Sequence, residues 1–456
     1  MTQKTSNRLV TKIILFGLIA YLFSINILIP TSAQNTGLIF HYKESEGRTW
    51  AAWVMNDVNG DGKREIGIAG AIYTKSLDLS GNEIWDQWGL HHEVQWACDS
   101  GIDANGDGIT EQLVFEAVWN NHYLLNGKTG VALESPDEEN RRDGLYWPII
   151  DCGFGLDVNV NGKGHNDYVI TGVVPWNDAP PVVRCLESDN GSLIWEYKLS
   201  EVSNGIRPIK INDTQQILVI SNNMTALSTQ GAHIWSRTAT AWSIAIIPNG
   251  SGANSDGIVI NTGSGISLIN ASDNGVLWSA PHNIGTIHYC GDINNDGVGD
   301  FGGLWSTGLK TGLFDGSDGS IIRNHTAQSL LNYMHGIIYC GDLNQDGFDD
   351  YGIYGDFSIH EIFSGLDGSQ LLAITGQDFH GAEEMYPVED VNGNGSPDIM
   401  LFNGGIVVID GWTLGTVDLP SVDDGIPGFN IGLAIIGVFG ILGLVYLERR
   451  KKENFT

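Results

Sequence analysis

The chain has 456 residues and a formal net charge of −31 at pH 7, with 54 acidic side chains against 23 basic ones. Such an acidic chain repels nucleic acid and anionic lipid, and it suits the binding of cations. The sequence is nevertheless 42% hydrophobic and contains 14 tryptophans, which excludes a disordered chain and indicates a packed core.

The N-terminal end has the pattern of a secretory signal peptide. The basic residues Lys4, Arg8 and Lys12 precede an apolar run over residues 13–29, and small residues follow up to Ala33. This order of charge, apolar core and small residues predicts a signal peptide over residues 1–33 that is cleaved after Ala33. The alternative for the same run is an uncleaved N-terminal membrane anchor.

An acidic loop repeats through residues 36–418, the predicted ectodomain. Its first copy reads Asp57-Val-Asn-Gly-Asp-Gly-Lys-Arg-Glu65, with side-chain oxygens at positions 1, 3, 5 and 9 and glycine at position 6. Two units, residues 209–217 and 248–258, have lost these side chains. The other copies begin at Asp103, Asp292, Asp342 and Asp390, and a variant that begins at Asp157 has two extra residues before its last acid.

A second motif, a glycine turn before an apolar strand, alternates with the acidic loop. Its clearest copies end in Trp85, Trp195, Trp235 and Trp278, and weaker copies contain Gly130, Gly319, Gly368 and Gly415. The two motifs form eight pairs, and successive acidic loops, the variant included, start 46 to 54 residues apart outside the two degenerate units. A period of this length with short apolar strands is typical of a four-stranded propeller blade.

We therefore predict an all-β fold, a β-propeller of eight four-stranded blades over residues 36–418, or of seven if one degenerate unit is an insertion. Residues 37–42 read as an extra outer strand that would complete the last blade and close the ring. The five cysteines are too few for a disulfide scaffold, and we expect Cys98, Cys152, Cys290 and Cys340 to be buried free thiols.

The acidic loops have the ligand pattern of a calcium site. Calcium takes about six to eight oxygens, and alternate residues of a tight turn place theirs on one side. Position 7 would offer its carbonyl, and position 9 would close the cage with a carboxylate. The plain alternative is hairpin turns, but several copies in phase with the strands favour several Ca2+ sites. The predicted ligands are Asp57, Asn59, Asp61, Lys63, Glu65, Asp103, Asn105, Asp107, Ile109, Glu111, Asp157, Asn159, Asn161, Asp167, Asp292, Asn294, Asp296, Val298, Asp300, Asp342, Asn344, Asp346, Phe348, Asp350, Asp390, Asn392, Asn394, Ser396 and Asp398.

The acidic loops resemble the FG-GAP repeats of integrin α-subunit propellers and related bacterial and archaeal surface proteins. The glycine turns before tryptophan resemble quinoprotein (PQQ-like) propeller repeats, and the two resemblances together cover nearly the whole predicted ectodomain. The first resemblance implies calcium in loops that join the first and second strands of a blade. The second does not extend to PQQ itself, because the chain has no vicinal cysteine pair and few basic side chains.

A second candidate site lies where the chain enters each first strand, at the end of the blades opposite the loops. Aromatic, histidine and acidic residues there would surround the mouth of the central channel. Such a site suits a carbohydrate or protein ligand, and His with Glu could also act as acid and base or bind a transition metal. The plainer alternative is that they only pack the blade ends. The candidates are His91, His92, Glu93, Trp147, Arg207, Trp242, His282, His335, His380 and Glu384.

The C-terminal end reads as a membrane anchor. A linker over residues 419–428 precedes an uncharged apolar run over residues 429–447, and the tail over residues 448–456 carries four consecutive basic residues. About twenty apolar residues cross a bilayer as a helix, with basic residues on the cytoplasmic side. We therefore predict a single-pass cell-surface protein with its N-terminal domain outside. Pro427, Gly428 and Phe429 resemble the C-terminal sorting signals of archaeal surface proteins, which implies that the helix is processed.

These patterns favour a calcium-stabilised cell-surface propeller for adhesion or for recognition of an extracellular glycan or protein. The alternative is an extracellular polysaccharide lyase, because some rhamnogalacturonan lyases resemble this chain in being eight-bladed propellers with acidic loops. A quinoprotein dehydrogenase is the least favoured interpretation. Export would make possible glycan acceptors of the Asn-x-Ser/Thr sequons at Asn190, Asn212, Asn223, Asn249, Asn270 and Asn324, whereas Asn394 lies inside a predicted metal loop and should be spared.

Overall fold

The computed structural model describes residues 37–418 except for segments 43–48, 71–72, 89–93, 117–121, 134–152, 173–179, 189–190, 204, 239–242, 253, 263, 306–309, 327–333, 356–359, 376–383 and 403–405. At 49–50, 88, 94–96, 116, 375, 384, 402 and 418 it describes the backbone only. The predicted signal peptide, linker, membrane helix and tail therefore lie outside the described residues. Within the described part, no helix is long and apolar enough to cross a membrane.

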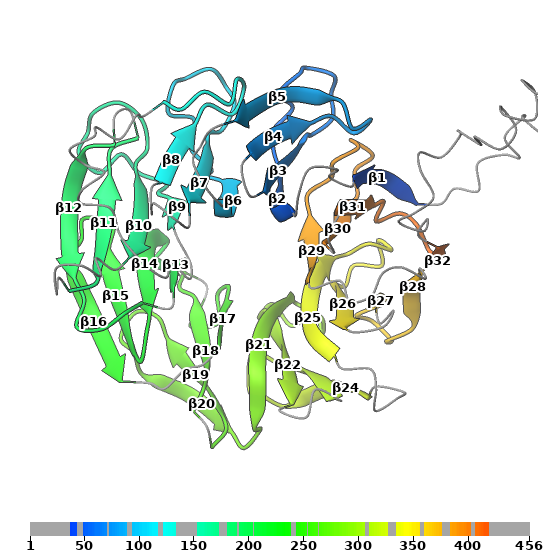
Figure 1. Ribbon diagram of the computed structural model, residues 1–456. Helices are drawn as coiled ribbons and strands as arrows, with labels where there is room; N and C mark the ends of the chain where they lie inside the picture. The colour runs from blue at the N-terminus through cyan, green and yellow to red at the C-terminus, as the bar shows by residue number, and fades with distance from the viewer. Residues whose placement is uncertain are drawn as a thin grey trace, which may run out of the picture.

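Eight sheets stand side by side around a ring and form an eight-bladed β-propeller (Figure 1). Blades follow one another in chain order, and the strands of blades 1 to 7 run in order from the centre of the ring to its rim. The first four blades contain β2 (Thr49–Val54), β3 (Ile66–Gly70), β4 (Tyr73–Leu77) and β5 (Glu83–Trp88); β6 (Val94–Asp99), β7 (Gln112–Glu116) and β8 (His122–Leu125); β9 (Gly153–Gly155), β10 (Tyr168–Gly172), β11 (Val182–Leu186) and β12 (Leu193–Lys198); and β13 (Gly205–Ile211), β14 (Thr214–Ile220), β15 (Asn223–Ser228) and β16 (His233–Thr238).

The second half of the ring repeats this order, so the eight-bladed prediction is confirmed and the seven-bladed alternative is wrong. The two degenerate units, residues 209–217 and 248–258, each belong to a complete blade. Blades 5 to 8 contain β17 (Ile244–Ile247), β18 (Gly257–Asn261), β19 (Ile266–Asn270) and β20 (Val276–Ala280); β21 (Ile284–Gly291), β22 (Asp300–Trp305), β23 (Lys310–Phe314) and β24 (Ile321–Thr326); β25 (Met334–Gly341), β26 (Asp350–Gly355), β27 (His360–Phe363) and β28 (Gln370–Thr375); and β29 (Glu384–Val388), β30 (Asp398–Phe402) and β31 (Ile406–Ile409).

The ring closes through the predicted N-terminal strand. β1 (Leu38–Tyr42) takes the outer place of blade 8 and pairs antiparallel with β31 (Figure 1). Phe40 of β1 is 2% exposed, and it packs in one cluster with Met400 of blade 8 and Ile66 of blade 1. The N-terminal and C-terminal parts of the propeller therefore contribute strands to the same sheet, and β1 covers the edge that β31 would otherwise leave unpaired.

The strand after the last glycine turn differs from the repeat pattern. That pattern predicts a fourth strand for blade 8, but β32 (Gly415–Asp418) pairs in parallel with β28 as a fifth strand of blade 7. β1 already occupies the outer edge of blade 8, so the edge of β28 is the neighbouring place where β32 finds backbone partners. Val417 of β32 is 1% exposed and packs in the apolar cluster between blades 7 and 8.

Among the described residues, the core consists of eight apolar clusters, one at each interface between adjacent blades. The second strands are buried on both faces, as the all-buried pattern of β3 shows, because each lies between two neighbouring blades. Cys290 and Cys340 are buried free thiols in two of these clusters, as predicted. Cys98 and Cys185 also form no disulfide, but Cys98 is only partly buried, which differs from the prediction, and Cys152 lies outside the described residues.

The tryptophans after the glycine turns connect neighbouring blades. Each donates its indole N–H to a backbone carbonyl in the turn that follows the third strand of the next blade. The pairs are Trp85 with Gly127 at 2.9 Å, Trp195 with Thr229 at 2.9 Å, Trp235 with Ala271 at 2.6 Å and Trp278 with Gly316 at 3.0 Å. In blade 6 the guanidinium of Arg323 makes the same connection to Ser364 and Gly365. The sequence pattern marks these tryptophans but not their partners.

Candidate metal sites

The acidic loops join the first and second strands of their blades, as predicted. Residues 57–65 connect β2 to β3, and the loops that begin at Asp103, Asp292, Asp342 and Asp390 occupy the same place in blades 2, 6, 7 and 8. The turns between third and fourth strands lie at the same end of each blade, because neighbouring strands are antiparallel. Side chains link the two motifs within a blade, for example Asn394 Nδ2 with Asp410 Oδ1 at 2.9 Å.

Hydrogen bonds within the first loop hold its side chains in place. The carboxylate of Asp57 accepts the backbone N–H of Gly60 at 2.7 Å and of Gly62 at 2.9 Å. Asn59 Oδ1 accepts the N–H of Asp61, and Asp61 Oδ1 accepts the N–H of Lys63. Gly60 and Gly62 have φ angles of 80° and 85°, a conformation that glycine adopts without strain. The loop thus turns its oxygens inward through bonds to its own backbone.

The carboxylates of Asp57, Asp61 and Glu65 form a group that could hold a metal ion. One oxygen from each residue lies within 4.8 Å of the others. Glu65 is 1% exposed, and it also has a structural role, because its Oε2 accepts the N–H of Val58 at 2.5 Å. Burial, together with the nearby charges of Asp57 and Asp61, raises the pKa of Glu65 to about 7. A cation in this group would offset both effects.

The same backbone pattern recurs in four other loops. The first aspartate of each accepts the N–H of the glycine at position 6, from Gly108, Gly297, Gly347 and Gly395, at 2.6 to 2.9 Å. The side chain at position 5 accepts the backbone N–H of position 7, from Ile109, Val298, Phe348 and Ser396. These copies share the turn geometry of residues 57–65.

The last acid of each loop is fully buried, and its length decides where its second oxygen goes. In the aspartate copies, Asp300, Asp350 and Asp398, one oxygen accepts the N–H of position 2 and the other accepts an N–H from the glycine turn of the same blade. Glu111 instead accepts Asn105 Nδ2 at 2.6 Å. Burial is the main cause that raises the pKa of Asp300 to about 7 and of Asp350 and Asp398 to about 6. In the part of the chain that the structure describes, three acidic oxygens converge within 4.8 Å only at Asp57, Asp61 and Glu65.

The variant loop of blade 3 has the same turn geometry, but it begins two residues later than the sequence pattern predicts. The amide oxygens of Asn159 and Asn161 both accept the N–H of Lys163, at 3.0 and 2.7 Å, and Asn159 Nδ2 donates to the carbonyls of Lys163 and Gly164. Asp167 is the position-9 acid of a loop that begins at Asn159, because its Oδ2 accepts the N–H of Val160, at position 2, at 2.7 Å. The predicted start at Asp157 is therefore wrong, and the loop has no extra residues. Asn159 and Lys163 stand at positions 1 and 5, where the first loop has Asp57 and Asp61.

The predicted residues of the channel mouth are described only in part. Arg207 donates to the carbonyl of its neighbour Ile206 at 3.1 Å, the ring of His282 lies 5.0 Å from that of Phe314, and His335 lies edge-on to Tyr354 at 6.5 Å. These three residues belong to blades 4, 6 and 7, and each of these contacts lies within a single blade. His91, His92, Glu93, Trp147, Trp242 and His380 lie outside the described residues, and Glu384 is described by its backbone only.

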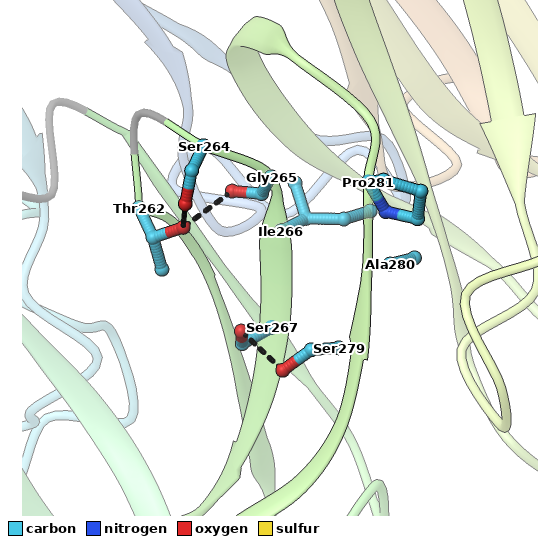
Figure 2. Close-up of a pocket in the computed structure, with 8 residues that line it drawn as sticks. All are labelled: Thr262, Ser264, Gly265, Ile266, Ser267, Ser279, Ala280 and Pro281. Carbon is cyan, nitrogen blue, oxygen red and sulfur yellow. Dashed lines mark hydrogen bonds between the residues drawn. The ribbon is translucent and has the colours of Figure 1, made fainter.

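A shallow depression of about 360 Å3 lies in blade 5, at the end opposite the acidic loops (Figure 2). Hydroxyl groups line it, together with Ile266 and Pro281. The hydroxyls bond one another, Ser267 with Ser279 at 2.8 Å and Thr262 with Ser264 at 3.3 Å. Among the described residues, its lining contains no charged or aromatic side chain.

Comparisons with known proteins support the fold. No protein-family model matches the chain, and no curated protein matches its sequence. Among solved structures, Saccharomyces cerevisiae Sqt1 has a TM-score of 0.55 at 10% identity, over 82% of this chain and 98% of Sqt1. The C-terminal WD40 domain of Sif2 has a TM-score of 0.52 at 10% identity, over 82% and 97% of the two chains. Rhamnogalacturonan lyase YesW has a TM-score of 0.51 at 15% identity, over 84% and 75%. At these identities the likeness shows the propeller fold.

Proposed function

We propose that this chain is a calcium-stabilised β-propeller, displayed at the cell surface through residues 429–447, that recognises an extracellular glycan or protein. The observation that supports calcium binding is the convergence of the carboxylates of Asp57, Asp61 and Glu65 in one loop. The turn geometry of that loop recurs in four other blades. The predicted ligand set holds oxygen donors alone, which favours a hard cation over zinc or copper.

Recognition is proposed from the exported architecture and from the mouth residues. A ring with an acidic face would offer a rigid surface for a partner, and binding residues commonly lie on loops held by such a scaffold. His282, His335 and Arg207 are near the entry or in the first strands of three blades, so they are the described candidates for contact with a ligand. The resemblance to FG-GAP propellers supports a role in binding rather than catalysis.

The first test measures calcium-dependent stability of the full-length chain, purified in a mild detergent. Calcium should raise the melting temperature over that in EGTA, because an ion that binds only the folded state stabilises it, by about 3 kcal/mol at a hundredfold excess over Kd. The variant Glu65→Gln should melt higher than wild type in EGTA, since it removes one repelling charge, and should gain less from calcium. Asp213→Asn, in an exposed turn without an acidic loop, is the matched control and should behave as wild type. Equal melting with calcium and EGTA would contradict the proposal.

The second part of the test asks what the surface recognises. The same chain with calcium is offered a panel of polysaccharides and surface glycoproteins, and binding and product release are recorded together. Binding without product supports a recognition module, and His335→Ala should then weaken binding without changing the melting temperature. Release of unsaturated oligosaccharides would instead establish the lyase alternative and overturn the recognition proposal.

A further inference from the structure

Two adjacent units in the ring lack the acidic loop side chains, and the structure shows what replaces them. In blade 4, β13 and β14 are joined by the two-residue turn Asn212–Asp213, whose φ angles are 51° and 61°. This turn leaves no loop around which a cation could be held. In blade 5, residues 248–256 keep the final acid, Asp256, but have Pro248, Gly250 and Gly252 at positions 1, 3 and 5.

Asp256 keeps the structural role of a position-9 acid but faces a lysine instead of other acids. It is 7% exposed, and its Oδ2 accepts the backbone N–H of Lys210 at 2.6 Å. Asp256 returns a bond from its own N–H to the carbonyl of Lys210 at 2.8 Å. The ammonium of Lys210 donates to Asn249 Oδ1 at 3.0 Å, in the same loop.

Further direct hydrogen bonds join these two units. The N–H of Asn212 donates to Ser255 Oγ at 2.9 Å, and the N–H of Asp213 donates to the carbonyl of Asn254 at 2.8 Å. Burial raises the pKa of Asp256, and the charge of Lys210 acts in the opposite direction. A buried carboxylate is stable when it is hydrogen-bonded and lies near a compensating positive charge. Lys210 of blade 4 supplies Asp256 with both, through its backbone N–H and through an ammonium that Asn249 holds in the same loop.

We propose that Lys210 supplies the positive charge that a metal ion supplies elsewhere, so that blades 4 and 5 form a calcium-independent sector of the ring. This proposal rests on the proposed calcium binding for the remaining loops. Opposite this sector, the contact between blades 8 and 1 involves two acidic loops. Arg64 of the first loop donates its backbone N–H to the carbonyl of Val391 at 3.0 Å, and its side chain forms an ion pair with Glu389. Loss of calcium would therefore weaken the closing contact of the ring while the opposite sector stays folded.

The first experiment measures hydrogen–deuterium exchange of the full-length chain with calcium and with EGTA. EGTA should speed amide exchange about tenfold or more in the second and third strands of blades 6 and 7, residues 300–314 and 350–363. Exchange in the matching strands of blades 4 and 5, residues 214–228 and 257–270, should stay within about twofold. Equal acceleration in both regions would overturn the sector while leaving calcium binding intact.

The second experiment is a double-mutant cycle that does not depend on calcium. Lys210→Met keeps the length of the side chain and removes its charge, and Asp256→Asn keeps an acceptor for the backbone of Lys210. In EGTA each single change should raise the unfolding equilibrium constant, and the double change should raise it about tenfold less than the product of the two. Lys198→Met, at an exposed position of β12, is the control and should show no coupling with Asp256→Asn.

The two experiments separate the two proposals. If EGTA changes exchange in no blade but Lys210 and Asp256 are coupled, the proposed calcium binding is wrong and the role of Lys210 is retained. No coupling would overturn the role of Lys210 whatever EGTA does to the other blades.

Discussion

At the scale of residues, hydrogen bonds within the acidic loop define its turn, and the candidate metal site is built on that turn. The bonds from the carboxylate of Asp57 to Gly60 and Gly62 span three and five residues, so the sequence motif predicts them. The bond from Gly316 to Asp300 spans sixteen residues and depends on the blade. The sequence shows whether position 9 is aspartate or glutamate. Only the structure shows whether the second oxygen of that acid accepts an N–H from the glycine turn, because the turn must lie beside the loop.

His360 is a buried histidine that the sequence analysis did not single out. It begins β27, is 1% exposed, and pairs through its backbone with Tyr354. Burial, and to a smaller extent the nearby His335, lowers the pKa of His360 to about 4. The unfolded chain protonates this side chain near pH 6.5, so the unfolded state binds more protons than the folded state between about pH 6.5 and 4.

The expected consequence is that His360 makes the fold sensitive to acid. Its contribution to stability is complete above pH 6.5 and is lost as the pH falls towards 4, by up to about 3 kcal/mol. His360→Phe should remove this part of the pH dependence in urea unfolding measured between pH 7 and 4.5. His233→Asn, at an exposed position of β16, should retain the wild-type dependence. If His360→Phe and wild type lose stability in parallel, the neutral state of His360 is not the cause.

At the scale of elements, the fourth strands both complete the blades and connect them. The indole N–H of Trp235 reaches across the interface between blades 4 and 5 to the carbonyl of Ala271, and the ring of Trp195 lies where a Cβ on Gly231 would stand. Glycine at that position of the turn is therefore required by the approach of the neighbouring tryptophan as well as by its φ of 75°. The two halves of the repeated motif, glycine and tryptophan, act on opposite sides of a blade.

Removing one such connection should destabilise the ring measurably. Trp235→Phe retains an aromatic ring but loses the hydrogen bond to Ala271 and leaves a buried carbonyl without its donor, at a cost of about 1–3 kcal/mol. Urea unfolding measures this change. Trp412→Phe is the matched control, because Trp412 is 50% exposed, and it should change stability by less than about 0.5 kcal/mol. Equal effects of the two substitutions would show that the interblade bond contributes nothing.

At the scale of the whole molecule, closure of the ring depends on both chain ends. β1 fills the outer edge of blade 8, and β32 adds to the outer edge of blade 7, so the last interface is covered from both sides (Figure 1). Val417 packs with Leu372 and Ile374 of blade 7 and with Val407 of blade 8. β32 thus connects the last two blades, by pairing with β28 and by packing Val417 between them; it is called the clasp below.

The clasp predicts opposite outcomes for two adjacent substitutions. Val417→Asp places a charge in the apolar cluster and should lower the free energy of unfolding by about 3 kcal/mol or release β32. Thr416→Asp, one residue earlier on the exposed face of the same strand, should have little effect. Urea unfolding together with amide exchange of β28 measures both. Similar stabilities for the two variants would mean that β32 does not hold the blades together.

The sequence by itself left the choice between eight and seven blades open, and the structure decided for eight because both degenerate units form complete sheets. The sequence did determine the repeat, the propeller, the closing role of residues 37–42 and the place of the acidic loops between first and second strands. These follow from short-range patterns, since strand periodicity, glycine turns and loop spacing are all properties of neighbouring residues. Only the tertiary structure decided that β32 leaves blade 8 for blade 7, because that depends on which edge β1 has already filled. It also decided that, among the described residues, three carboxylates converge in the first loop and in no other predicted loop, because the length and second bond of the last acid differ between copies. The contact between Lys210 and Asp256 likewise depends on adjacent blades, since the two residues are forty-six apart in the chain.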